Sequence, residues 1–397
     1  MEQLAIRNRA RPAALFSLMG IAVRIGQRMG LHRDGSLLDL PPVKAEEKRR
    51  VWWHMQHMDI MLFQVLGCLS MTLYAEWDTK LPANLDDQDF SPEMEVLPPD
   101  RYGLTSISHC LWRYHILYEQ RLARHSDKFH KDFAWLTSPR VSVVEKEAYV
   151  ERVSRTMGEK FVQHCELLNP LHVSIQIGIR SFILAIKRIV HQSGVANMKI
   201  SNMPKRERDE FLRNTVECLE YYILGETTPS IAQFRWHNEN YFQWPACMSL
   251  FPAISFCCTA SHSHPVVYVI IEAHHRAATR EASALWSLIN KICSVHPKLV
   301  SAPERPDIIA IAQLIVIAWT QHEEHLRRLH CQIEKPSYVA KMEKYMNIFV
   351  QSPNLDMGWD PKSFMTLDLD MIDWSTWERA EYAPVMTNSG LQASHPA

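Results

Sequence analysis

Apolar residues recur every three or four positions along most of this 397-residue chain, which is the spacing of one face of an α-helix. Leu15, Met19 and Ala22 begin such a series after Pro12, and Gly30 suits the C-terminal cap of the helix that they predict. No stretch of useful length shows the alternation typical of a strand, and only 12 glycines are available for tight turns. The predicted fold class is therefore all-α, a large multi-helix bundle.

The same spacing predicts further helices. A second helix is expected from about Lys44, with Trp52 and Trp53 enlarging its buried face. Its buried stripe is expected at Val51, Met55, Met58, Leu62, Val65 and Leu69. Other helices are expected over residues 104–123, 146–168, 171–192, 205–224, 231–258, 266–295, 307–330 and 339–350. Residues 75–100 contain four prolines and form the longest irregular segment.

The balance of charge argues against a self-sufficient DNA-binding domain. Lysine and arginine total 43 against 44 acidic residues, whereas phosphate binding usually requires a clear basic excess. The short basic runs at residues 48–50 and 205–208 stand beside acidic residues, so we interpret them as solvated helix faces. Nothing at the N-terminus resembles a signal peptide, and charges at Arg180, Lys187 and Arg188 interrupt the most apolar helix. We expect a soluble protein without a membrane span.

Nine cysteines are scattered along the chain, and no two of them form a Cys-x2-Cys pair. This distribution predicts reduced, mostly buried thiols rather than a disulfide framework or a cysteine zinc site. In the segment "HEEH", residues 322–325, the two histidines are three positions apart, whereas a zinc-binding helix of the zincin type needs four. We interpret that segment as a hydrated helix face.

An acidic stretch, "DTKLPANLDDQDF" at residues 78–90, suggests a metal site of the kind found in terpene-synthase-like enzymes. Such a site needs carboxylates on one face of a helix and a second acidic triplet opposite them. Here Asp86, Asp87 and Asp89 follow Pro82 in a loop, and no matching triplet occurs. We therefore interpret the stretch as a structural or interaction loop, and we predict neither enzymatic activity nor a cofactor or metal site in this chain.

Three motifs together resemble the middle homology region of fungal-specific transcription factors, the regulatory domain that accompanies zinc binuclear cluster DNA-binding domains. In that family a helix ending in Gly-Leu-His-Arg-Asp precedes a helix that opens with acidic and basic residues and Trp-Trp, and an Asp-x-x-Leu-Pro loop with an acidic end follows. The matching residues here are Gly30, Leu31, His32, Arg33, Asp34, Arg49, Arg50, Trp52, Trp53, Asp78, Leu81, Pro82, Asp86, Asp87 and Asp89. Residues 234–251 and the ending "DWSTWER" also resemble the family.

The resemblance implies a fold of the regulatory-domain type over residues 1–350, truncated at its N-terminus, followed by an acidic-aromatic segment and polar tail over residues 351–397. It also implies a nuclear transcription regulator, and control of a specialised-metabolite gene cluster is a common role in the family. The family's six-cysteine zinc cluster is absent from this chain, so zinc is expected only if a missing N-terminal cluster exists. The implied partners are the transcription machinery or a related zinc-cluster factor, with a small-molecule effector possible and no specific DNA binding by this chain alone.

Two further expectations concern the motifs and the rival functions. Arg49 or Arg50 is expected to bind Asp86, Asp87 or Asp89, which would tie the proline-rich loop to the second helix.

The alternatives to a transcription regulator are a helical metal-dependent enzyme and a small-molecule sensor or dimerising partner of a longer relative. The acidic-aromatic end is either an activation segment or a packed terminal helix.

Overall fold

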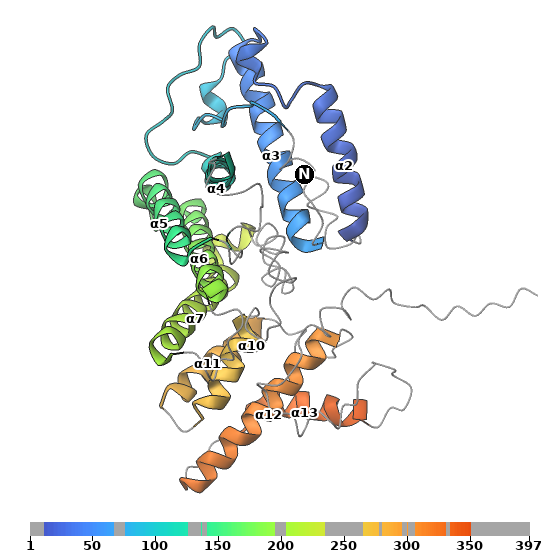
Figure 1. Ribbon diagram of the computed structural model, residues 1–397, viewed down its shortest axis with the longest axis vertical. Helices are drawn as coiled ribbons and strands as arrows, with labels where there is room; N and C mark the ends of the chain where they lie inside the picture. Colours follow the sequence, from blue (N-terminus) through green and yellow to red (C-terminus); the bar gives the residue numbers. More distant parts are fainter. Residues whose placement is uncertain are drawn as a thin grey trace, which may run out of the picture.

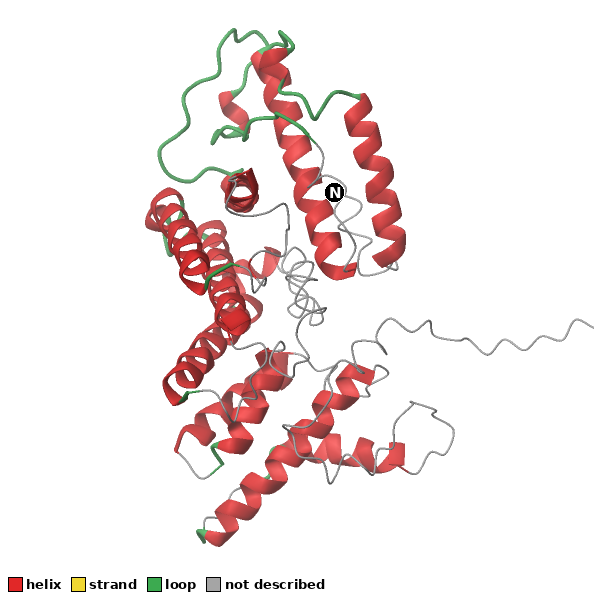
Figure 2. Cartoon of the chain, viewed as in Figure 1, coloured by secondary structure: helices red, strands yellow, loops and turns green. Residues whose placement is uncertain are grey.

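The computed structural model describes residues 12–66, 76–125, 136, 141–194, 204–234, 265–277, 280–295, 300, 306–330 and 334–350. Within these ranges all regular structure is helical, so the predicted all-α class is confirmed for them (Figure 2). The α-helices are α2 (Pro12–Arg28), α3 (Pro42–Leu66), α4 (Ser108–His125), α5 (Val143–Lys160), α6 (Pro170–Gly194), α7 (Lys205–Thr227), α10 (Pro265–His275), α11 (Arg280–Val295), α12 (Pro306–Arg328) and α13 (Ser337–Val350). Short 3-10 turns are η1 (Gly35–Leu37), η2 (Asp87–Asp89), η4 (Val162–His164) and η6 (Pro229–Phe234).

The helices pack largely on their neighbours in the sequence, so the fold progresses from one end of the molecule to the other (Figure 1). Helix α2 lies along α3, and α3 contacts α4. Helix α6 joins α4, α5 and α7, and α7 in turn contacts α10 and α11. Helices α12 and α13 pack together at the far end, where α12 also contacts α10.

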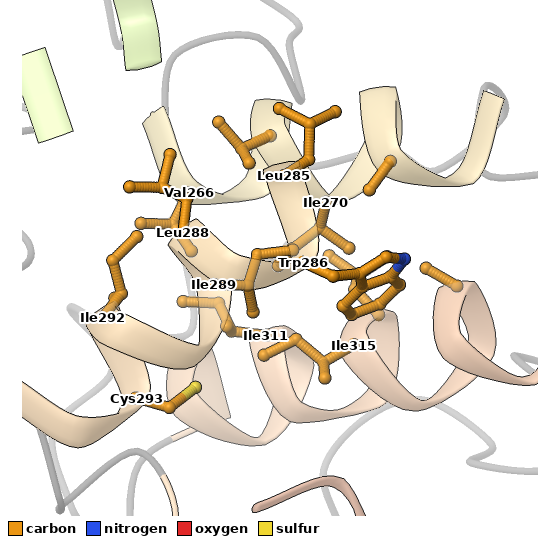
Figure 3. Packing of buried hydrophobic residues seen from close by; sticks show 14 of the residues in the cluster. Val266, Ile270, Leu285, Trp286, Leu288, Ile289, Ile292, Cys293, Ile311 and Ile315 are labelled. Carbon is orange, nitrogen blue, oxygen red and sulfur yellow. The ribbon is translucent and has the colours of Figure 1, made fainter. Parts of the chain in front are cut away.

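Three apolar clusters hold these helices together. The first is formed mainly by α10, α11 and α12, whose side chains such as Ile270, Trp286 and Ile315 interlock in Figure 3. The second joins α3 to α4, α5 and α6 around Trp53. The third is small and lies between α2 and α3, where Met19 is almost fully buried.

The buried face of α3 differs from the expected stripe. Val51 is 49% exposed, whereas Trp52 and Trp53 are buried, as are Met58 and Ile60. The reason is that α3 is covered on one side by α2 and on another by α4, so its contacts are not confined to one narrow face. Met55 is half-buried, and the side chains of Leu62, Val65 and Leu69 lie outside the described part of the chain.

Two expected helices are interrupted. The helix expected over residues 266–295 is divided, because α10 ends at His275 and α11 begins at Arg280. The helix expected over 146–168 ends at Lys160, where the separate turn η4 follows. Of the expected helix 231–258, residues 235–258 lie outside the described ranges, as does the acidic-aromatic end after residue 350. No described helix combines the length and the apolar character needed to cross a membrane.

Candidate functional site

The three sequence motifs meet in one place, which we call the motif junction and define as residues 30–36, 46–53 and 78–90. It lies where the turn after α2, the first half of α3 and the loop before α4 come together. Gly30 ends the α2 turn with φ +70°, a left-handed conformation that glycine adopts without a Cβ clash. The chain then enters η1, and both the turn and the loop contact the same part of α3.

Asp34 is the centre of the junction. Its side chain is fully buried and forms two hydrogen bonds with Arg49, Nε to Oδ2 at 2.8 Å and Nη2 to Oδ1 at 2.7 Å. The backbone amides of Ser36 and Lys80 donate to the same carboxylate at 3.0 and 2.8 Å. Burial alone would raise the pKa of Asp34, but the hydrogen bonds from Arg49, Ser36 and Lys80 outweigh it and hold that pKa well below its usual value.

The loop after residue 76 is fixed to the α2 turn through a second set of bonds. The Asp34 amide donates to Asp78 Oδ1 at 2.6 Å, and the Asp78 amide donates to the His32 carbonyl at 3.1 Å. Thr79 donates from its buried hydroxyl to the Leu31 carbonyl at 2.8 Å. Asp78 also forms an ion pair with Arg33, at 2.9 Å. Because this pair is exposed to solvent, it contributes little to stability.

Two buried tryptophans carry the apolar side of the junction. Trp53 Nε1 donates to the Lys80 carbonyl at 2.8 Å, and its ring meets the Trp77 ring edge-on at 5.2 Å. Trp52 contacts both Trp77 and His32, with ring centroids 6.1 Å apart in each case. The Arg121 guanidinium of α4 covers Trp77 at 3.5 Å from the ring centroid. The Trp-Trp pair therefore joins α3 to the loop and to α4.

Arg50 makes the expected contact between α3 and the acidic loop. Its Nη1 lies 2.7 Å from Asp87 Oδ1, and its Nη2 donates to the Leu85 carbonyl at 2.9 Å. Its Nε donates to Glu46 Oε1 at 3.1 Å. Glu46 is buried, and both of its oxygens also accept from the Ala83 amide. Burial raises the pKa of Glu46, although the Ala83 and Arg50 hydrogen bonds act in the opposite direction.

The other loop carboxylates are bound by an arginine that the sequence analysis missed. Arg101 pairs with Asp89 and, at 3.3 Å, with Asp86. Asp86 Oδ1 also accepts the Ser106 amide at 2.8 Å, and the hydrogen bonds from Ser106 lower the pKa of Asp86. Arg101 thus binds carboxylates of its own loop, whereas Arg50 binds the loop to α3. In the sequence, the only feature that could have indicated this role was the position of Arg101, two residues after Pro99.

The expectation named Arg49 or Arg50 as the partner of the acidic loop; Arg50 is that partner, whereas the Arg49 guanidinium is bound by Asp34. The interpretation of residues 48–50 as a solvated face is wrong, since the Arg49 side chain is only 11% exposed. The remaining motif residues lie within the junction: Leu31 and Pro82 are buried and Leu81 is half-buried. All the predicted motif residues are therefore close together.

The chemistry available to the junction is limited. Asp34, Glu46, Asp86, Asp87 and Asp89 each already accept a hydrogen bond from an arginine or pair with one. Across the described residues no group of three or more histidines, cysteines or acidic residues is placed to hold a metal ion. What the arrangement does is hold the α2 turn and the proline-rich loop against α3.

A second ionic cluster, between α7 and α10, has no counterpart in the predicted sites. Glu272 is fully buried and binds Arg208 and Arg276, each at 2.7 Å. Arg276 also reaches Asp209 at 2.5 Å and pairs with Glu281 of α11. Arg208 belongs to the basic run at residues 205–208, so that run is not simply a solvated face. The cluster links helices through charges that lie far apart in the sequence.

The segment "HEEH" is not a hydrated face throughout. His322 is 3% exposed and lies against the rings of Trp286 and Trp319, with centroids 5.8 and 5.5 Å away. Its Nδ1 is 3.3 Å from the Ala277 carbonyl, and burial lowers the pKa of the imidazole. His325 is half-exposed, so only part of the segment faces solvent.

Comparisons with known proteins agree with the motifs. The sequence profile described as "Fungal specific transcription factor domain" matches residues 3–135. The aurofusarin cluster transcription factor of Gibberella zeae is 27% identical over 324 residues, 80% of this chain and 44% of that protein. The pyriculol/pyriculariol biosynthesis cluster transcription factor 1 of Pyricularia oryzae is 22% identical over 368 residues, 88% of this chain and 45% of that protein. A shorter match, 41% identical over 85 residues, covers 21% of this chain and 12% of a Zn(2)-C6 fungal-type transcription factor of Macrophomina phaseolina.

The matched region includes the whole motif junction, because residues 30–90 fall inside residues 3–135. The chain spans less than half the length of the first two relatives. No solved structure matches it significantly. The resemblance is thereby confirmed: residues 3–135 match the fungal specific transcription factor domain.

Proposed function

We propose that this chain is a nuclear transcription regulator that controls genes of a specialised-metabolite cluster. The observation that carries the proposal is the match of residues 3–135 to the fungal specific transcription factor domain. It is supported by relatives named as transcription factors of the aurofusarin and pyriculol/pyriculariol clusters, each aligned over at least 80% of this chain. We further propose that the regulatory domain extends over residues 1–350 and that residues 351–397 form a distinct segment.

The 397 residues are proposed to act through a DNA-bound partner, either a related zinc-cluster factor or the transcription machinery. Their formal charge of −1 provides no basic excess for phosphate binding, and their cysteines include no Cys-x2-Cys pair. The motif junction supports a role in presenting a rigid surface, since its charges are used to fix chain segments together. No enzymatic role is proposed, because the loop that suggested one is bound by Arg50 and Arg101.

The experiment that tests this function is controlled expression of the 397-residue chain in its host, followed by transcript sequencing. We expect transcripts of one contiguous group of biosynthetic genes to change severalfold when the chain is deleted or overproduced. An Arg49→Ala variant, which loses the buried partner of Asp34, should lose the effect. The matched Arg328→Ala variant, whose guanidinium side chain is 73% exposed, should retain it.

The proposed partner is tested separately with purified chain. A fluorescent fusion should concentrate in the nucleus, and chromatin precipitation should recover the promoters of the affected genes. Purified chain alone should not discriminate these promoter fragments from unrelated DNA at physiological salt. Sequence-specific nanomolar binding by the chain alone would contradict the partner, and an unchanged transcript profile would contradict the regulatory function.

A further inference from the structure

Helix α2 exposes an apolar stripe on the side that does not face α3. Leu18, Ile21, Ile25 and Met29 are 43, 55, 53 and 62% exposed. Their spacing of three, four and four residues places them on one face of the helix. They adjoin the buried face that includes Met19, so apolar character continues around the helix from core to surface. Figure 1 shows α2 at the edge of the fold, with α3 along one side of it.

The flank of this stripe is basic. Arg24 and Arg28 are exposed, and neither has an ion-pair partner among the described residues. Helix α2 contains no aspartate or glutamate to offset them. A surface that combines exposed isoleucines with unpaired arginines fits an acidic, apolar partner, which would bury its side chains on the stripe and place its carboxylates beside the guanidinium groups.

We propose that the stripe on α2 binds the acidic-aromatic segment of this same chain, residues 367–378. This segment lies outside the described residues, so its sequence carries the argument. It reads "LDLDMIDWSTWE" and contains four carboxylates, six apolar side chains and no lysine or arginine. Trp374 and Trp377 supply the large side chains that most often anchor such contacts. Its charge of −4 complements Arg24 and Arg28.

A second copy of α2 is a poorer occupant of the stripe. Two α2 helices packed face to face would bring four arginines together without a carboxylate from either helix. Like charges at an interface disfavour association. The acidic-aromatic segment offers the same kind of apolar surface together with the opposite charge. The contact would place the end of the chain beside the matched family domain.

Photo-cross-linking of the full chain tests the contact. A benzoylphenylalanine is substituted for Ile25, and the irradiated protein is digested with trypsin, which releases residues 363–379 as one peptide. We expect this peptide to be the main cross-linked product. The same group substituted for Val144 of α5, a residue that is 73% exposed, is the control position and should not capture it.

A charge variant distinguishes specific docking from collision. Replacing the three aspartates by Asp368→Asn, Asp370→Asn and Asp373→Asn should lower the yield at least fivefold, with unchanged thermal unfolding as the folding control. Raising the salt from 0.05 to 0.5 M should also lower it, because the flanking charges are exposed. A cross-link to another region, a cross-link between two α2 helices, or a yield that the Asn variants leave unchanged would each overturn the proposal.

Discussion

The Arg49 guanidinium binds the Asp34 carboxylate through two hydrogen bonds, at 2.8 and 2.7 Å, and both side chains are withdrawn from solvent. The two residues are 15 positions apart, on either side of the turn that joins α2 to α3. A paired geometry of this kind is stronger and more directional than a single charged contact. It joins the Gly-Leu-His-Arg-Asp motif directly to the basic run of α3.

Removing Asp34 should therefore be costly. We expect Asp34→Ala to lower the free energy of unfolding by about 3–5 kcal/mol, because Arg49 is left as a buried charge without its carboxylate. Urea unfolding at neutral pH measures the change. Glu324→Ala is the matched control, since its exposed pair with Arg328 should contribute less than about 0.5 kcal/mol. Equal effects of the two substitutions would contradict a structural role for the buried pair.

The same carboxylate predicts a dependence of stability on pH. In the unfolded chain Asp34 takes up a proton near its ordinary pKa of 3.8, whereas the folded protein lowers that pKa. The unfolded state therefore binds more protons as the pH falls below about 5, and the free energy of unfolding should fall with it. Above that pH the contribution of Asp34 is fully present.

Asp34→Asn isolates this contribution. Urea unfolding at several pH values between about 6 and 3.5 should give a shallower decline for the variant than for the unchanged protein. Glu46, whose pKa is raised by burial, acts in the opposite direction but is present in both proteins. Parallel pH profiles would show that Asp34 does not contribute to acid sensitivity.

Gly35 and Gly158 form a matched pair of substitutions to alanine. A Cβ at Gly35 would lie 2.6 Å from both the Cα and the Cβ of Ala45, so the turn η1 would have to move away from α3. We expect Gly35→Ala to cost about 1–3 kcal/mol. A Cβ at Gly158 in α5 meets nothing within 4 Å, so Gly158→Ala should instead stabilise by about 0.5–1 kcal/mol. Thermal unfolding of both variants checks the opposite signs.

A double-mutant cycle tests the contact of α3 with the acidic loop. Asp87 is 88% exposed, so Asp87→Ala should cost less than about 0.5 kcal/mol and its coupling to Arg50 should be below about 1 kcal/mol. Arg50→Ala should cost about 2–3 kcal/mol, because Glu46 and the Leu85 carbonyl also lose a donor. Charge reversal at Arg50 should therefore be only weakly rescued by reversal at Asp87. Strong rescue would show that the loop carboxylate, and not buried Glu46, is the main partner.

Local regularities in the sequence were sufficient for the helices and for the family. Helical spacing located α2, α3, α7, α12 and α13 to within a few residues of their observed ends, because periodicity and capping act within a turn or two. The order of the three motifs identified the matched region, residues 3–135. The division between α10 and α11 was missed, because the apolar spacing continues across residues 276–279.

The partners of the charged residues were decided only by the tertiary structure. From the sequence, Arg49, Arg50 and the loop aspartates were equally plausible partners; in the fold Arg49 binds Asp34, Arg50 binds Glu46 and Asp87, and Arg101 takes Asp86 and Asp89. The Glu272 cluster likewise could not be predicted from the sequence, since Arg208 lies 64 residues before Glu272. A helix forms from contacts within four residues, so the residues that specify it lie close together in the sequence. An ion pair forms wherever folding brings two charges within about 4 Å, and that distance depends on how every helix between them packs.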